Sequence, residues 1–535
     1  MTVTIQTILL LLAVLVIVAV VARRLNIAAS ILLVAAGIAL ALIPGLPRIE
    51  LAPELVLLGI LPPLLYSAGV AMSWREFRFN LRPIAQLAFG CVLFTAAAVA
   101  AVCHYLLGMS WALGFVLGAI VAPTDSVAPL AIVRRLGLPR RLVVVLEGEG
   151  LANDATALIM YRFAVAAVGS GLFSLSTAMG EFGLIVVGEI AYGIAVGWGS
   201  LRLRRWAEDQ RVEITLSLMT PYVAFLLPAH LGGSGVLAAV AAGLYVSWNG
   251  PLLISGTTRL QGIFFWDLLI YLLEGLVFLV TGMQLRTLLD RTDQALLHQL
   301  MLAVPLTVAV IFVARFLWVY PAAYIPRWLS PALARRDPTP SWQFLFMLGF
   351  TGVRGVVSLA AALALPLTTT AGLPFPDRDL ILFVTFGIIV VTLIGEGVVL
   401  APIVRWLALP RDADEERKRE YAAELKARIE TLKVAESRLE RLEVDGDTEA
   451  DAMALLRAHQ EHRVQQWPKD ADGKAAVAVA LAVRTDLIRA EREYIYGLLR
   501  QGRITDEARR RIERDLDLEE ATIMLDREDE DDPPL

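Results

Sequence analysis

Long apolar segments fill the first 410 residues of the chain, and short polar or basic turns separate them. A window of about 20 residues, the helix length that crosses a bilayer, finds about thirteen such segments. They are predicted to be membrane-spanning helices over residues 4–22, 27–44, 52–72, 83–107, 110–133, 142–169, 180–201, 213–229, 234–249, 262–285, 297–326, 341–366 and 378–408. The predicted fold class is therefore an all-α polytopic membrane protein.

Arginine residues gather at alternate turns of this pattern. They follow the first, third, fifth, seventh and eleventh segments, as Arg23/Arg24, Arg75/Arg78/Arg82, Arg134/Arg135/Arg140/Arg141, Arg202/Arg204/Arg205/Arg211 and Arg327/Arg335/Arg336. The intervening turns contain only Arg48, Arg286, Arg291 and Arg378. Because basic residues concentrate in cytoplasmic loops, we expect a multi-pass protein of the cell (inner) membrane with its amino terminus outside and its carboxy terminus in the cytoplasm.

Composition agrees with this interpretation. Hydrophobic residues make up 57% of the chain, and the mean hydropathy of +0.63 excludes an ordinary soluble protein. The two cysteines, Cys91 and Cys103, share one apolar segment, so a disulfide framework is not expected. The net charge of −5 averages two unlike parts, and nothing in it predicts a nucleic-acid partner.

The chain changes character after residue 410. Residues 411–535 are dense in charge, and Leu432, Ala435, Leu439 and Leu442 recur at helical spacing. We predict two domains, a transmembrane exchanger domain over 1–410 and a helical cytoplasmic tail over 411–535. Either the tail serves regulation or self-association, or its helices are simply solvated. Breaks are expected at Gly446 and over 468–473, and disorder over 527–535.

Two carboxylates lie in the middle of apolar segments. Asp125 belongs to the fifth segment and Asp154 to the sixth. A carboxylate at this depth is costly, and its usual purpose in a membrane protein is a pathway for a substrate, an ion or a proton. Asp125 and Asp154 are therefore the first candidates for binding a cation and a proton.

The fifth and twelfth segments each contain a helix breaker near the middle. Pro123 and Thr124 precede Asp125, and residues 349–355 read GFTGVRG. Proline removes a hydrogen-bond donor, and non-helical backbone persists at this depth only inside protein or beside a wet cavity. An offset of seven segments makes the two helices run in opposite directions. This predicts two inverted repeats of six helices each, with the seventh segment as connector and with crossed broken helices, as in secondary transporters.

The sixth segment supplies further polar groups. Glu149 and Asn153 share one helical face at a spacing of four residues, whereas Asp154 lies on the neighbouring face. Arg354, in the second break, needs an anion at its depth, and Glu149 is the expected partner in a structural ion pair. Asp154 then faces a cavity beside Asp125, while Asn153 either binds the ion or holds the crossing helices.

Other intramembrane polar side chains are assigned secondary roles. Glu147 and Glu274 are accessory candidates for the ion site, together with Ser67. For Glu274, Glu189 and Glu396, a structural partner or a water-facing position is favoured over transport chemistry.

Two aspartates in a wet pocket can hold either a proton or a small cation. Desolvation favours the protonated form, and a bound cation favours the charged form, so each ligand expels the other. Asp125 and Asp154, with the backbone carbonyl groups around Thr124, suit a hard monovalent cation such as Na⁺ or K⁺. No GxxxxGK[ST] loop occurs, so an ion gradient rather than ATP is the expected energy source, and no cofactor is expected.

The motifs PTDSVA, EGEGLAND and GVRGVVSLAAALALP, in this order, resemble those of the NhaP-type bacterial sodium/proton antiporters and the related animal sodium/hydrogen exchangers. LPPLLYSAG in the third segment is also similar to that family. The resemblance covers nearly all of residues 1–408. It implies a homodimer of thirteen-helix subunits that serves pH homeostasis, with a core domain that moves against a dimerisation domain. It also implies that Asp154 carries cation and proton, that Asn153 and Asp125 with Thr124 complete the site, and that Glu149 pairs with Arg354.

The sequence departs from the family pattern at three positions. Family members commonly have Ser where this chain has Gly150, an acidic residue where it has Ser67, and Pro where it has Ser126. The first two differences remove a hydroxyl and a carboxylate from the expected cation shell. In the family, Asn before the essential Asp accompanies electroneutral exchange, so one cation per proton is the hypothesis.

Three alternatives stay open beside a Na⁺/H⁺ antiporter. The first is a K⁺/H⁺ or Li⁺/H⁺ antiporter with the same mechanism. The second is a membrane enzyme, which we do not expect because His104 and His230 lie near segment ends, far in sequence from any activated nucleophile. The third is a membrane sensor without transport activity, whose tail carries the signal.

Overall fold

The structure is a computed structural model. It describes residues 5–25, 27–44, 51–125, 129–130, 138–170, 174–289, 294–369, 372–407, 471–501, 503 and 506–531, with isolated positions between 419 and 437. The chain divides into two compact units, Met1–Pro410 and Arg411–Leu535. Among the described residues of both units the regular structure is entirely helical, which confirms the predicted fold class.

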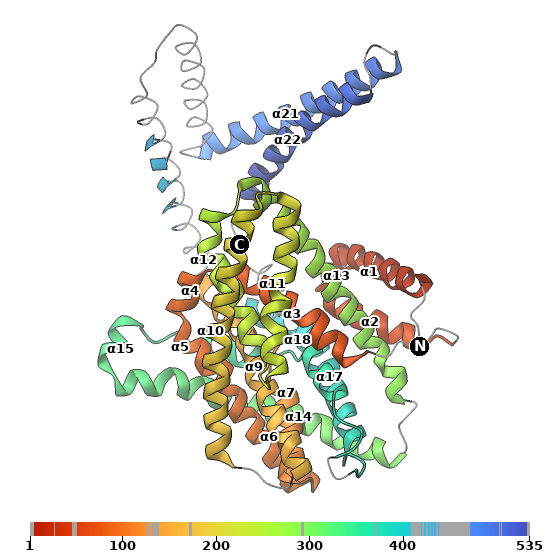
Figure 1. The fold of residues 1–535 in the computed structure, drawn as a ribbon, viewed down its shortest axis with the longest axis vertical. Helices are drawn as coiled ribbons and strands as arrows, with labels where there is room; N and C mark the ends of the chain where they lie inside the picture. Colours follow the sequence, from red (N-terminus) through yellow and green to blue (C-terminus); the bar gives the residue numbers. More distant parts are fainter. Residues whose placement is uncertain are drawn as a thin grey trace. The chain divides into compact units, whose positions relative to one another are not determined.

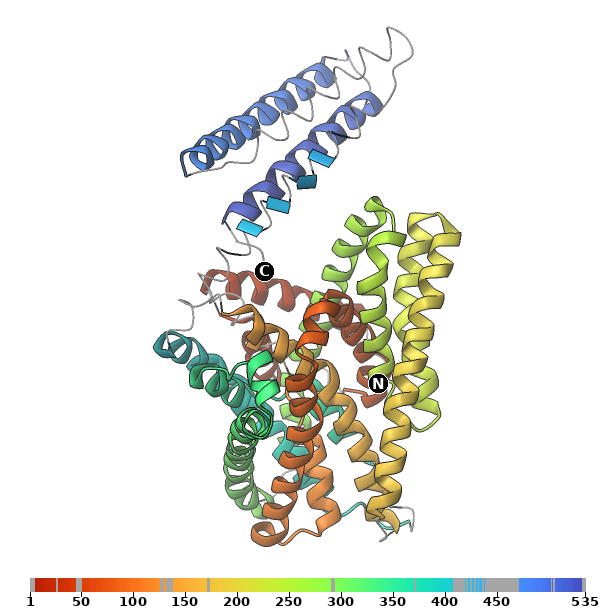
Figure 2. The same cartoon turned by 90° about the vertical axis from the view of Figure 1, so that its left-hand side faces the viewer.

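The first unit is a bundle of long helices (Figures 1 and 2). Its elements are α1 (Ile5–Leu25), α2 (Ala29–Ala41), η1 (Leu55–Ile60), α3 (Leu61–Ala71), α4 (Trp74–Phe79), α5 (Leu81–Ala85), η2 (Gln86–Cys91), α6 (Val92–Leu107), α7 (Trp111–Val121), α9 (Arg140–Ser170), α10 (Leu175–Ala207), α11 (Gln210–His230), α12 (Val236–Leu253), α13 (Gly256–Leu289), α14 (Gln294–Leu329), α15 (Pro331–Arg336), α16 (Trp342–Phe350), α17 (Val356–Leu363) and α18 (Arg378–Leu407). The two short π-helices, η1 and η2, continue directly into α3 and α6.

Each predicted apolar segment contains helix, but the segments are not all equivalent. Within the described part of the chain, nine helices are long and apolar enough to cross a membrane alone. The second, third and fifth segments form shorter apolar helices, and the twelfth is split between α16 and α17. The predicted count of thirteen spans and the inverted repeat therefore remain predictions, whereas the helical, membrane-spanning architecture is established.

Small residues allow several helices of the first unit to touch through their backbones. A Cβ atom on Gly37 of α2 would overlap the carbonyl oxygen of Leu279 on α13, and one on Gly193 of α10 would overlap the carbonyl oxygen of Ala238 on α12. Helices in a lipid environment associate through such close van der Waals packing, because the lipid provides little hydrophobic driving force between them. The figures accordingly show α10 beside α12, and α2 beside α13.

Glu189 has a structural partner, as the sequence favoured. Its carboxylate lies at the start of α12 and accepts hydrogen bonds from the backbone N–H groups of Gly235, at 2.9 Å, and of Leu237, at 3.1 Å. The hydroxyl of Ser234 donates to the same carboxylate. Glu189 on α10 thus satisfies the free N–H groups and the dipole at the amino terminus of α12.

The second unit contains two paired helices, α21 (Ala471–Arg500) and α22 (Asp506–Asp531). Ile488, Ile495 and Leu516 form their apolar contact. Arg484 donates to Glu519 from Nη2 at 2.7 Å, and this hydrogen bond lowers the pKa of the Glu519 carboxyl. A carboxyl group with a lowered pKa stabilises the folded state when the pH is above its ordinary pKa, and this stabilisation is lost only in acid. The contribution of this exposed ion pair therefore does not change with pH near neutrality.

Two details of the predicted tail are wrong. α22 extends to Asp531, so residues 527–531 are helical rather than disordered, and α21 begins at Ala471, inside the predicted break at 468–473. The acidic composition of residues 527–531 suggested disorder, but they continue the helix that is paired with α21. Gly446 and most of residues 408–470 lie outside the described residues, as do Ser126, Arg134 and Arg135 of the first unit.

Candidate ion site

Both predicted helix breaks are present. α7 ends at Val121, and the chain at Thr124 and Asp125 is not helical. α16 ends at Phe350, and α17 begins only at Val356. The first break follows from Pro123, as predicted, because proline cannot continue the helical hydrogen bonding.

The two breaks are joined to each other through their backbones. The N–H group of Asp125 donates to the carbonyl oxygen of Val353 at 2.7 Å. The Nε of Arg354 donates to the carbonyl oxygen of Val121, at the carboxyl end of α7, at 2.9 Å. Each unwound segment therefore satisfies polar groups that the other helix leaves free. The arginine charge also lies favourably at the negative end of the α7 dipole.

Two side chains of α18 accept hydrogen bonds from the backbone of the second break. The carboxylate of Glu396 accepts from the N–H of Gly352 at 2.9 Å, and the Oγ1 of Thr392 accepts from the N–H of Arg354 at 3.1 Å. Both acceptors replace hydrogen bonds that a continuous helix would have made. Glu396 therefore has the structural partner that the sequence favoured.

The predicted ion pair between Glu149 and Arg354 is wrong. Glu149 on α9 pairs instead with Arg315 on α14, whose Nη2 lies 2.8 Å from Oε2 and whose Nη1 contacts Oε1. Both side chains are almost completely buried. The Nε of Arg315 also donates to the carbonyl oxygen of Leu348, at 2.8 Å. The guanidinium of Arg354 is turned away, toward Val121 and the carbonyl oxygen of Gly352.

Sequence reasoning missed Arg315, although a signal was available. Arg315 is a charged residue in the middle of the apolar segment 297–326, and a charge at this depth calls for a named partner. Once Arg315 is included, two arginines compete for Glu149. The rotation of α14 about its axis decides which arginine pairs with Glu149, and sequence spacing does not determine that rotation.

Thr124 and Asn153 extend this ion pair into the first break. The hydroxyl of Thr124 donates to Oε1 of Glu149 at 3.0 Å. The Nδ2 of Asn153 donates to the carbonyl oxygen of Thr124 at 2.7 Å and to its Oγ1 at 3.1 Å. Arg315, Glu149, Thr124 and Asn153 thus form one buried chain that fixes the backbone immediately before Asp125. Of the two roles expected for Asn153, this contact matches the one in which its side chain holds the crossing helices together.

A cavity of about 430 Å³ opens beside the crossing of the two breaks. It is lined by Asp125, Thr124, Asp154, Gly150, Glu147 and Glu274, and by apolar side chains of α3, α13 and α17. Asp125 and Asp154 are both partly exposed, so their carboxylates can be reached by water and ions. The structure therefore brings together the two predicted carboxylates and two of the three accessory candidates.

Ser67, the third accessory candidate, is not among the lining residues. The part of α3 that faces the cavity consists of Leu61, Leu64, Leu65, Ala68 and Ala71. Gly150 does line the cavity, and it contributes no side-chain oxygen there. The α3 wall and the position of Gly150 are therefore apolar, and the side-chain oxygens that line the cavity come from α9, α13, the first break and Ser358 of α17.

Gly355 is required by the close approach of the two breaks. A Cβ atom at this position would overlap the carboxylate of Asp125. We expect Gly355→Ala to displace Asp125 and to weaken the apparent cation affinity of exchange by about tenfold or more, since small misplacements of binding groups cost about this much. Gly395→Ala on α18 is the matched control, because a Cβ there meets nothing within 4 Å. Equal affinities of the two variants in a liposome exchange assay would contradict the assignment.

Comparison with known proteins agrees with this geometry. The model of the sodium/hydrogen exchanger transmembrane family matches residues 10–406. The chain belongs to the sodium/hydrogen exchanger family. This confirms the resemblance found in the motifs and places the chain among transporters rather than enzymes.

Individual relatives agree with this placement. An uncharacterised Na⁺/H⁺ exchanger of Mycobacterium tuberculosis is 33% identical over 520 residues, which cover 94% of this chain and 93% of the relative. A sodium, potassium, lithium and rubidium/H⁺ antiporter of Bacillus subtilis is 32% identical over 382 residues, covering 69% of this chain and 56% of that protein. The structure of the sodium proton antiporter MjNhaP1 from Methanocaldococcus jannaschii has a TM-score of 0.55 at 20% identity, covering 74% of this chain and 97% of that chain, and so shares the fold.

Proposed function

We propose that this family member is a secondary antiporter that exchanges a monovalent cation, Na⁺ in the first place, for H⁺ across the cell membrane. The observation that carries the proposal is the presence of Asp125 and Asp154 on one cavity at the crossing of two broken helices. Family membership supports the reaction class. The substrates are the cation and the proton, and the chemistry requires no cofactor.

Competition between the two ligands at Asp154 accounts for the exchange. When Asp154 is protonated, the cation loses its charged ligand; when the cation binds, the proton leaves. Asp125, from the first break, supplies a second carboxylate to the same cavity, which Thr124 also lines. Exchange follows if the occupied site opens to one side of the membrane at a time, by alternating access.

The buried chain from Arg315 to Asn153 gives this site a rigid base. Arg315 and Glu149 compensate each other's charge, so neither is available to a transported ion. Asn153 is committed to Thr124 through its Nδ2, and its role is to hold the unwound backbone next to Asp125. We therefore assign Asp154 and Asp125 to ion binding, and Glu149, Arg315 and Asn153 to positioning.

The proposed setting is the cell membrane, with the arginine-rich turns in the cytoplasm. The amino terminus then lies outside, the tail lies in the cytoplasm, and two copies form a homodimer surrounded by lipid. The alternation of basic turns supports the orientation. The dimer rests on the family resemblance alone. Electroneutral exchange of one cation per proton, in the service of pH homeostasis, completes the proposal.

K⁺ or Li⁺ as the transported cation is the second candidate. Gly150 and the apolar face of α3 leave the cavity wall short of oxygen ligands on those sides. A cation with a smaller dehydration cost is handicapped less by missing ligands than Na⁺ is, which favours K⁺. The broad cation range in the name of the Bacillus subtilis relative is compatible with this candidate.

Purified protein in liposomes with an internal pH dye tests the proposal. Addition of Na⁺, K⁺ or Li⁺ to one side should discharge an imposed pH gradient, with Na⁺ effective at the lowest concentration. Clamping the membrane potential should not change the rate if one cation exchanges for one proton. If K⁺ discharges the gradient at a lower concentration than Na⁺ does, the protein is a K⁺/H⁺ antiporter. Failure of all three cations, in vesicles shown to contain folded protein, would refute antiport.

A further inference from the structure

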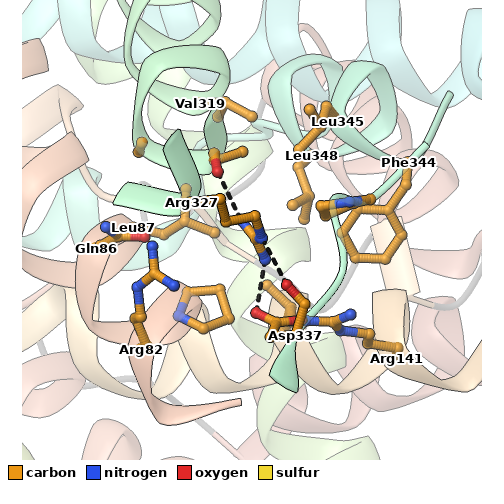
Figure 3. A pocket seen from close by; sticks show the side chains of 15 residues that line it. Arg82, Gln86, Leu87, Arg141, Val319, Arg327, Asp337, Phe344, Leu345 and Leu348 are labelled. Atoms are coloured by element: carbon orange, nitrogen blue, oxygen red, sulfur yellow. Dashed lines mark hydrogen bonds and ion pairs between the residues drawn. The ribbon is translucent and has the colours of Figure 1, made fainter. Parts of the chain in front are cut away.

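A second polar site lies away from the ion cavity, where α5, α9, α14 and α16 meet. Figure 3 shows Arg82, Arg141 and Arg327 around a single carboxylate, that of Asp337. Their side chains line a cavity of about 40 Å³, which has room for more than one water-sized group. Three of the four charges at this site are positive.

Both oxygens of Asp337 accept hydrogen bonds from two of the arginines. Its Oδ1 accepts from Nη2 of Arg141 at 2.8 Å, and its Oδ2 accepts from Nη2 of Arg327 at 2.6 Å. Arg327 also donates to the backbone carbonyl oxygens of Ala323 and Asp337. The nearby acid Glu76 is occupied in turn, because it accepts two hydrogen bonds from Arg140.

Arg82 has no such partner. Its Nη1 and Nη2 are both buried from solvent and make no hydrogen bond. Its guanidinium is repelled by the charge of Arg327 and attracted by that of Asp337, but it makes no hydrogen bond to the Asp337 carboxylate through Nη1 or Nη2. Buried polar groups in proteins are almost always paired, and a buried charge without a partner is costly. Two arginines that repel each other across a cavity indicate that an anion belongs between them.

We propose that this cavity binds a phosphate group, with Arg82 as its specific ligand and Arg327 as the second positive charge. The planar guanidinium fork matches the oxygens of phosphate and holds them through two parallel hydrogen bonds. The group comes from the headgroup of an anionic lipid or from free phosphate. The site lies among the arginine-rich turns, where helices end and lipid headgroups lie.

The position of the site gives the bound phosphate a means to influence exchange. One wall is α9, which carries Asp154, another is α14, which carries Arg315, and a third is α16, the first half of a broken helix. A ligand that holds these helices together at one end stabilises whichever state of the transporter has this arrangement. Coupling between two sites is reciprocal, so cation binding then also changes phosphate affinity.

The test compares the full-length wild type with Arg82→Gln and with Arg78→Gln, an exposed arginine of α4 that undergoes the same charge change. Thermal unfolding is followed in detergent while inorganic phosphate replaces chloride at constant ionic strength. Lipid bound after purification from phosphatidylglycerol vesicles, with phosphatidylcholine vesicles as reference, is measured by mass spectrometry. Arg82→Gln should weaken binding by about tenfold or more, whereas Arg78→Gln should not change it.

The unfolding and lipid-binding measurements together distinguish the two sources of the phosphate group. Saturable stabilisation by inorganic phosphate assigns the free anion, and retention of phosphatidylglycerol alone assigns a lipid headgroup. Without either ligand, Arg82→Gln should be at least as stable as the wild type, because the arginine has no acceptor to lose. Three results would overturn the proposal: a lower stability of this variant, equal binding by Arg82→Gln and the wild type, or a wild type that binds neither ligand. Arg82→Lys, which keeps the charge without the fork, should bind with intermediate affinity.

Discussion

Asp154→Asn is expected to abolish cation-driven proton movement in reconstituted liposomes, with a loss of about 100-fold or more. Truncating one partner of a buried charge pair costs roughly 2–5 kcal/mol, and here the lost group is also the carrier of the proton. Asparagine keeps the size of the side chain and removes both functions. The measurement is the initial rate of dye response after a Na⁺ pulse.

Asp267→Asn is the matched control for this variant. Asp267 is exposed on α13 and is not among the residues that line the cavity. The control should exchange at the wild-type rate, and both variants should elute as folded protein. Wild-type exchange by Asp154→Asn would remove Asp154 from the mechanism.

Arg315→Gln is expected to be the most destabilising single change in the first unit, at roughly 3–5 kcal/mol. It leaves the carboxylate of Glu149 buried without its positive partner, although Thr124 still donates to it. The double variant Glu149→Gln with Arg315→Gln should recover part of the loss, because no uncompensated charge remains. The measurement is equilibrium or thermal unfolding in detergent, analysed as a double-mutant cycle.

Two controls make the cycle specific. The same cycle between Glu149 and Arg354 should give a smaller coupling, since these two side chains do not form an ion pair in the structure. Arg140→Gln removes a partly exposed ion pair with Glu76 and should cost about 1 kcal/mol or less. A larger coupling of Glu149 with Arg354 than with Arg315 would show that the side chains are paired as the family resemblance implies.

The sequence predicted the parts of the site that depend on local chemistry. Pro123 and the glycines at 349–355 determine where the helices break, and hydrophobicity determines that Asp125 and Asp154 lie within apolar segments. Both breaks are found, and both carboxylates line one cavity. The positions of the breaks and the depth of the two carboxylates need no information about how distant helices are rotated, so the sequence was sufficient for them.

The features that were missed all depend on packing between distant segments. Arg315 takes the partner expected for Arg354, and the partner of Glu189, which the sequence did not identify, is the start of α12. Ser67 is absent from the cavity wall although its neighbours on α3 line it. In each case the sequence contains a polar residue in an apolar segment but does not determine the direction of its side chain. Rotation of a helix about its axis decides that direction, and the packing of the whole unit sets the rotation.

In the proposed mechanism, cation and proton compete for one carboxylate in the cavity, that of Asp154. The most direct test measures proton release from purified protein in weak buffer when Na⁺ or K⁺ is added at several pH values. The wild type should release protons, and its apparent cation affinity should fall about tenfold per unit of decreasing pH where Asp154 is protonated, by linkage. Asp154→Asn should release none. Cation affinity independent of pH, or undiminished proton release by Asp154→Asn, would rule out competition at Asp154.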